Sequence, residues 1–200
     1  MEELERITRA VMARGFVEME ASGRHVHLTK EQSMELFGHQ LTPKRPLSQP
    51  GQYLARERVT VVGPRGSFAN VAVLGPERRE GQVEISLTDG KTLGIDAPVR
   101  LSGEVENTPG VVLEGEKGRI VLQKGVIVAK RHIHLEPEGA KRLGVEDGQV
   151  VRLRAFTRRP LIFGDVVVRV REDFANYAHL DFDEANACGF HKGDLGRILP

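Results

Sequence analysis

The chain has 200 residues, of which 40% are hydrophobic and 28% charged, and its formal net charge is +1 at pH 7. A globular chain of this length holds one domain or two small ones, and this charge balance excludes a disordered tail and a strongly basic nucleic-acid binder. The lone Cys188, the lack of an apolar run of roughly 18 residues and the acidic opening predict a cytoplasmic protein with no internal disulfide, membrane span or secretory signal.

The first predicted element is an amphipathic helix. Helical periodicity is clear over residues 2–13, where Leu4, Ile7, Val11 and Met12 share one face. We assign residues 1–20 to this N-terminal helical segment.

Short runs rich in Val and Ile follow, and Gly, Pro or Asp residues bound them. Runs of about five to eight such residues predict strands. The clearest are RVTVVG, NVAVLG, GQVEISL, GRIVLQKGVIVAKRHIHL, GQVVRLRAF and DVVVRVRE. Two short helices are predicted in TKEQSMELFG and EPEGAKRLG, with Thr29 and Glu136 at the N-caps and Gly38 and Gly144 at the C-terminal ends. The fold class is therefore mainly β, a sandwich or barrel with short capping helices.

The phrase RHVHL at residues 24–28 returns as RHIHL at residues 131–135, and the similarity continues into the segment that follows each copy. Each copy predicts one strand that runs into one short helix, which is typical of an internal duplication. We therefore expect two similar Gly-rich β domains over residues 21–110 and 111–200. Their boundary falls in the turn-rich stretch SGEVENTPG, and exchange of strands between the two domains stays open.

The two HxH triplets predict metal ligands. Side chains at positions i and i+2 of a strand point to the same face, so two imidazoles there converge on one point. Neutral imidazole is the commonest metal ligand. The pairs His25 with His27 and His132 with His134 are therefore candidate ligand pairs, and four histidines that only pack on a sheet are the alternative.

Three more residues stand out by position, and the pattern alone leaves each of them open. Glu84 is either a ligand or part of a solvated strand face. His179 follows a long apolar strand and precedes an acidic loop, and it is either a ligand or not. Arg78 lies six residues before Glu84, where a guanidinium would suit an oxyanion, although an ordinary surface arginine is the simpler interpretation. We interpret His39 and His191 as surface histidines.

Several phrases together resemble the PduL-type phosphotransacylases, also called phosphate propanoyltransferases. They are SGRHVHLT, LSQPGQ, VGPRG, VLGPER, QVEIS with TDG, LGIDAPVRLSG, GVIVAKRHIHL, GVEDGQVV and HLDFDEANA, in order from about residue 20 to about residue 190. The resemblance implies two Gly-rich β-barrel domains with a two-metal zinc site at their interface. It also implies reversible transfer of a short acyl group, acetyl or propionyl, between coenzyme A and inorganic phosphate.

The resemblance assigns roles to individual residues of this chain. It implies six metal ligands, an arginine that binds phosphate, and five contacts to coenzyme A (CoA). The ligands are His25, His27, Glu84, His132, His134 and His179, the arginine is Arg78, and the CoA contacts are Ala21, Ser22, Gly23, Arg65 and Asn186. The sequence departs from the family pattern at Ala72, Gly81 and Phe182, which bear on CoA and acyl binding rather than on the reaction. At position 65, Arg replaces the commoner Lys.

The resemblance also frames the mechanism and the alternatives. We expect direct attack of phosphate on the acyl carbon with metal assistance, whereas an acyl-enzyme route would need Cys188 as the nucleophile. A metal-dependent hydrolase or thioesterase and a non-enzymatic zinc-binding module are the alternatives. In some relatives a comparable N-terminal helix delivers the enzyme into a bacterial microcompartment. For the N-terminal helix of this chain, we prefer the role of capping a barrel, and targeting to a microcompartment, with shell proteins as partners, is the alternative. The sequence leaves open whether the protein forms a homo-oligomer.

Overall fold

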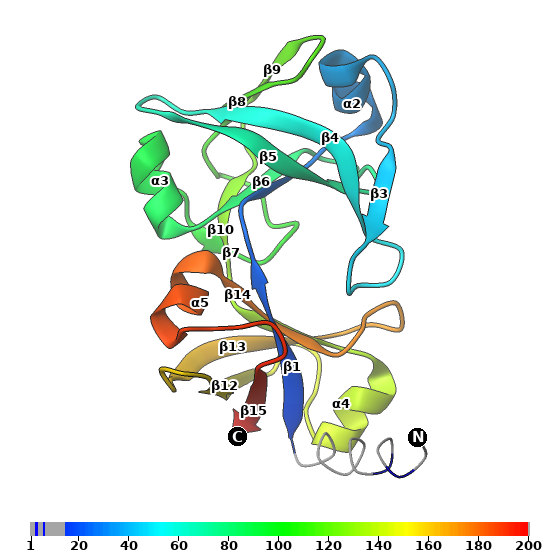
Figure 1. The fold of residues 1–200 in the computed structure, drawn as a ribbon, viewed down its shortest axis with the longest axis vertical. Coiled ribbons are helices and arrows are strands. Elements are labelled where there is room, and N and C mark those ends of the chain that lie inside the picture. Colours follow the sequence, from blue (N-terminus) through cyan, green and yellow to red (C-terminus); the bar gives the residue numbers. More distant parts are fainter. Residues whose placement is uncertain (1–2, 4–5, 7–14, 200) are drawn as a thin grey trace. The chain divides into compact units, whose positions relative to one another are not determined.

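The structure is a computed structural model that describes residues 3, 6 and 15–199. The helix predicted over residues 2–13 therefore lies outside the described residues, apart from Glu3 and Arg6. Within the described part of the chain, no helix combines the length and the apolar character that a bilayer crossing needs. The chain forms two compact units, one from residues up to Ser22 and from Lys130 onward, the other from Gly23 to Ala129 (Figure 1).

The first unit, here called the barrel unit, is a closed six-stranded β-barrel. Its strands in order around the barrel are β1 (Phe16–Ser22), β14 (Tyr177–Asp181), β11 (His132–Leu135), β13 (Ile162–Val170), β12 (Val150–Phe156) and β15 (Leu195–Leu199). Two short helices, α4 (Pro137–Leu143) and α5 (Phe182–Cys188), directly follow β11 and β14. Alternate residues of these strands, such as Ile133 and Leu180, fill the barrel.

The second unit, the sheet unit, is a nine-stranded sheet. Its strands in order are β7 (Val99–Arg100), β10 (Val126–Ala129), β6 (Gln82–Ile85), β2 (His25–His27), β5 (Ser67–Gly75), β4 (Tyr53–Val62), β8 (Val111–Glu114) and β9 (Arg119–Leu122), with β3 (Pro43–Pro46) paired to β4. Helices α2 (Lys30–Phe37) and α3 (Leu87–Leu93) follow β2 and β6 after connections of two residues and one residue. A second hydrophobic core, which includes Val26 and Val83, belongs to this unit.

The two units repeat one plan, which confirms the mainly β class and the duplication. In each, the HxH strand pairs in parallel with one strand and antiparallel with another: β2 with β5 and β6, and β11 with β13 and β14. The predicted helix ends are also confirmed. Thr29 accepts a hydrogen bond as the N-cap of α2, and Gly38 and Gly144 end α2 and α4 with φ of 79° and 67°.

The sequence predicts a boundary between the two domains near residue 110, whereas in the structure the sheet unit continues to Ala129. Strands β8 and β10 pair with β4 and β6, so residues 111–129 belong to the sheet unit. The units also exchange strands reciprocally: β1 precedes β2 but pairs with β14, and β10 precedes β11 but pairs with β6. A boundary read from turn residues misses this, because strand pairing is non-local.

The N-terminal helical segment was predicted too long. Residues 16–20 form part of β1, not helix. Val17 and Met19 are buried while Phe16, Glu18 and Glu20 are only partly so, which is the two-residue period of a strand with one face in a core.

Candidate metal centres

The first candidate metal centre lies in the sheet unit and joins His25, His27 and Glu84. Register places Glu84 of β6 directly opposite His25 of β2. The Nε2 atoms of the two histidines are 3.2 Å apart, and carboxylate oxygens of Glu84 lie 3.6 Å from Nε2 of His25 and 3.7 Å from Nε2 of His27. Ligand atoms at about 2.0 to 2.1 Å from a tetrahedral zinc ion are about 3.3 Å apart. The three side chains therefore surround a space of the size that a zinc ion needs.

Backbone and side-chain hydrogen bonds orient these three side chains. Nδ1 of His25 lies 2.8 Å from the carbonyl oxygen of Gly23. A carbonyl only accepts, so Nδ1 carries a proton, and in the neutral imidazole Nε2 then presents its lone pair toward His27 and Glu84. Oε1 of Glu84 accepts hydrogen bonds from Nε2 of Gln82 at 2.6 Å and from Oγ of Ser102 at 2.8 Å. Partners of this kind are typical of the surroundings of metal ligands.

Electrostatics favour a neutral imidazole at His27 and an ionised carboxylate at Glu84, which are the states that metal ligands adopt. Burial lowers the pKa of His27 to about 4, with His25 and Arg78 adding to the effect, so its imidazole is neutral at pH 7. Burial raises the pKa of Glu84, but His25 and His27 outweigh it and hold that pKa well below its ordinary value. Burial also opposes the charge on His25, yet Glu84 raises the pKa of His25 overall.

Arg78 is connected to this centre through one hydroxyl. Its NH1 donates to Oγ of Ser102 at 3.0 Å, and the same Oγ donates to Glu84. Its backbone N–H donates to the carbonyl of Leu28, one residue beyond His27. A pocket of about 190 Å³ opens at this point. Its lining residues are Arg78, Arg79, Glu80, Gln82, Gly103 and Val105. Two guanidiniums in the lining suit a small anion.

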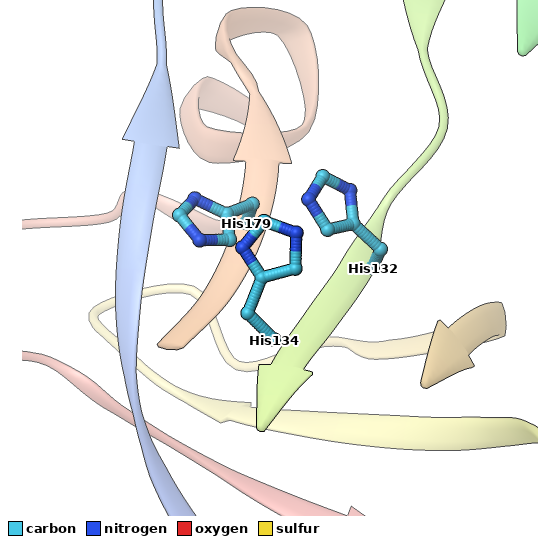
Figure 2. A group of neighbouring side chains, drawn as sticks. All are labelled: His132, His134 and His179. Atoms are coloured by element: carbon cyan, nitrogen blue, oxygen red, sulfur yellow. The ribbon is translucent and has the colours of Figure 1, made fainter. Parts of the chain in front are cut away.

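The second candidate centre lies in the barrel unit and joins His132, His134 and His179. Figure 2 shows the three imidazoles converging, two from β11 and one from β14. His179 is directly opposite His132, the position that Glu84 holds opposite His25. One ring nitrogen of each residue lies within 4.8 Å of the others. The two centres are therefore copies of one another in which the third ligand differs.

The second centre contains polar atoms that a metal would satisfy. Both ring nitrogens of His134 are buried, and within residues 15–199 they have no hydrogen-bond partner. Burial, followed by the neighbouring His132 and His179, strongly lowers the pKa of His134, so it is neutral. Nδ1 of His132 donates to the carbonyl of Lys130 at 2.8 Å, as His25 does to Gly23. A carboxylate oxygen of Glu20 lies 3.7 Å from Nδ1 of His179.

The five residues expected to contact CoA are divided between the units. Ala21 and Ser22 of β1 pair with Leu180 and Asp181, which lead into α5, and the exposed Asn186 lies on that helix. Gly23 begins the sheet unit. Arg65 is exposed in the turn between β4 and β5, where its backbone N–H donates to the carbonyl of Leu93 at the end of α3.

The remaining singled-out residues also have definite places. His39 and His191 are exposed, and Cys188 is fully buried. Ala72 is opposite His25 on β5, beside the first centre. A Cβ at Gly81 would approach the end of the Gln32 side chain to 2.5 Å, and Phe182 is exposed at the start of α5.

Sequence reasoning missed several residues that support the centres. Gln82 had a readable signal, since it shares a strand face with Glu84. Ser102 had none, because it lies 18 residues from Glu84 in a turn. Glu20 was hidden because β1 was assigned to a helix. The helices α3 and α5 were also missed. They begin three residues after Glu84 and His179, and their capping boxes start at Ser86 and Asp181.

Fold and site together define a duplicated β protein with two histidine-rich ligand groups and an arginine beside one of them. The sequence model of the phosphate propanoyltransferase family matches residues 18–191. Proteins named phosphate propanoyltransferase from Clostridioides difficile and Listeria monocytogenes are 50% and 52% identical, each over 98% of this chain and over 95% and 93% of their own length. One from Thermotoga maritima is 54% identical over 89% of this chain and 86% of its own. The chain belongs to the phosphate propanoyltransferase family, which supports a phosphotransacylase activity.

Proposed function

We propose that the chain reversibly converts a short-chain acyl-CoA, propionyl-CoA or acetyl-CoA, and inorganic phosphate into acyl phosphate and CoA. The observation that carries this proposal is the hydrogen-bonded line from Arg78 through Ser102 to Glu84. It joins a guanidinium, which suits phosphate, to a carboxylate of a three-residue ligand group within one unit.

The two ligand groups fit Zn²⁺ as the cofactor, one ion in each. His25, His27 and Glu84 would hold one, and His132, His134 and His179 the other. Imidazole-rich sets favour zinc or cobalt over magnesium, and three protein ligands leave a coordination position open, as in catalytic zinc sites. Bound there, zinc would polarise a thioester carbonyl and stabilise the charge that develops on its oxygen.

Side chains of the protein bind and orient phosphate, which is the nucleophile. Arg78 binds phosphate through its planar fork, and Ser102 holds that fork in place. A phosphate oxygen attacks the acyl carbon, a C–O bond forms, the C–S bond breaks, and CoA leaves as the thiolate. Cys188 supports direct attack over an acyl-enzyme route, because it is fully buried and burial raises the pKa of its thiol. For CoA itself we propose Ala21, Ser22, Gly23, Arg65 and Asn186 as contacts.

The test is thiol release from propionyl-CoA and from acetyl-CoA, with and without phosphate, by zinc-loaded protein and by His132→Ala. We expect release that requires both phosphate and His132, and the ratio of the two rates reports the preferred acyl chain. Release without phosphate would instead indicate a thioesterase. No release from either substrate would favour a zinc-binding module.

We further propose a cytoplasmic protein, consistent with its single buried cysteine. Delivery into a bacterial microcompartment through residues 1–16 is testable by deletion. If the truncated enzyme stays folded and active and still co-purifies with shell proteins, these residues are not the tag. Size-exclusion chromatography of the full chain decides between a monomer and a homo-oligomer.

A further inference from the structure

The arginine of each RHxHL phrase is not a member of either candidate ligand group, yet it makes a defined set of contacts. In the sheet unit, Nε and NH2 of Arg24 donate to the two carboxylate oxygens of Asp89 at 3.0 and 2.7 Å. The guanidinium carbon of Arg24 also lies 4.1 Å from the ring centroid of Phe68. Asp89 is only 5% exposed and is the N3 residue of α3, the helix that follows Glu84. Arg24 thus ties the start of β2 to the segment that carries the third ligand.

The barrel unit repeats these contacts. Arg131 donates to Oε1 of Glu184, the N3 residue of α5, which follows His179. Its guanidinium carbon lies 5.9 Å from the ring centroid of Phe163. In both units the acidic residue lies five positions after the third ligand. Phe68 and Phe163 each lie four positions before the residue that is paired with the first histidine of their unit. The arrangement therefore occurs twice on different residues, although Asp and Glu differ in length.

The arginines adjoin the backbone that orients the first histidine of each pair. Nδ1 of His25 donates to the carbonyl of Gly23, and Nδ1 of His132 donates to the carbonyl of Lys130. Arg24 and Arg131 are the residues between that carbonyl and that histidine. An arginine held by its acid restricts the peptide that carries the carbonyl, and the carbonyl in turn restricts the imidazole ring.

We propose that Arg24 and Arg131 are positioning residues of the two metal centres. Each one, through Asp89 or Glu184, holds the first histidine with its Nε2 directed at the third ligand before a metal arrives. The inference rests on the proposed metal-binding function and adds to it the residues that preorganise the ligands. Partners that orient metal ligands typically contribute about 10- to 100-fold to metal affinity.

If Arg24 had a purely structural role, a different result would be expected. Asp89 already accepts from the backbone N–H of Ser86 as part of the α3 capping box. If Arg24 only supported that cap, its loss would lower the melting temperature of the metal-free protein and leave the affinity for metal unchanged. Affinity and melting temperature must therefore be measured on the same variants.

The experiment is titration of the full chain with Co²⁺ against a competing chelator, followed by the visible absorption of bound Co²⁺. A His132→Ala, His134→Ala background isolates the first centre. In it we expect Arg24→Gln to weaken Co²⁺ binding about 10- to 100-fold and to alter the Co²⁺ spectrum, with Arg24→Lys intermediate. Asp89→Asn, which keeps the shape of the capping side chain, should match Arg24→Gln, and the exposed Arg45→Gln is the matched control. In a His25→Ala, His27→Ala background, Arg131→Gln should weaken the second centre in the same way.

The outcomes separate the two ideas. If the parent chain and both backgrounds bind no Co²⁺, the metal-binding part of the proposed function fails and this inference fails with it. If they bind Co²⁺ and the Arg24, Asp89 and Arg131 variants bind it as tightly with the same spectrum, only the positioning role is overturned. A melting temperature that falls without any change in affinity leads to that same conclusion.

Discussion

Ser102→Ala is the substitution that best tests the link between phosphate and metal. The hydroxyl accepts from Arg78 at 3.0 Å and from Gln82 at 2.9 Å, and it donates to Glu84 at 2.8 Å. Removing it deprives two charged groups of a partner at once but leaves the backbone unchanged. Because Ser102 lies in a turn, outside any strand or helix, we expect the fold to be retained.

The expected magnitude follows from the bonds that are lost. A hydrogen bond to a charged group contributes about 1.5 to 3 kcal/mol, and each 1.4 kcal/mol corresponds to a tenfold change. Losing the bond to Arg78 should therefore raise KM for phosphate about 10- to 100-fold. Losing the bond to Glu84 should weaken metal binding by a smaller factor, since Gln82 still donates to that carboxylate.

The assay is phosphate-dependent thiol release from propionyl-CoA, with phosphate and CoA ester varied separately on the zinc-loaded enzyme. Ser67→Ala, at an exposed position of β5, is the control. We expect KM for phosphate to rise in Ser102→Ala while KM for the CoA ester stays close to that of the parent. A KM for phosphate within twofold of the parent value would refute the role of Ser102 in holding Arg78.

Three further predictions concern the same chemistry. Arg78→Lys keeps the charge but loses the fork, so kcat/KM for phosphate should fall about tenfold or more in steady-state assays, and parent-like values would exclude bidentate binding. Dialysis against a chelator should abolish phosphate-dependent thiol release and lower the melting temperature measured by circular dichroism, and added Zn²⁺ should restore both. Activity that survives dialysis would argue against metal assistance. Cys188→Ala should keep full activity. It should lose about 1 to 2 kcal/mol of stability in urea unfolding, because it removes a buried sulfur. Ping-pong kinetics in the parent, together with loss of activity in this variant, would establish the acyl-enzyme route instead.

Much of the fold was readable because its signals are local. The two histidines of each HxH triplet were expected on one face of a strand because side chains two positions apart share a face. The ends of α2 and α4 were expected from Thr29, Gly38 and Gly144. The duplication was readable because the same phrase occurs twice. The extent of β1 was misjudged because an alternating run next to a helical pattern was counted with the helix.

The sequence by itself determined the class of fold, the duplication and the pairs of histidines, since each of these depends on residues a few positions apart. Only the tertiary structure decided that Glu84 lies opposite His25 and that His179 lies opposite His132, because strand register is non-local. It likewise decided the strand exchange of β1 and β10 and the pairing of Arg24 with Asp89, which are 65 residues apart. Contacts of this kind depend on how the strands pair across the whole chain, and no local pattern of residue types encodes them.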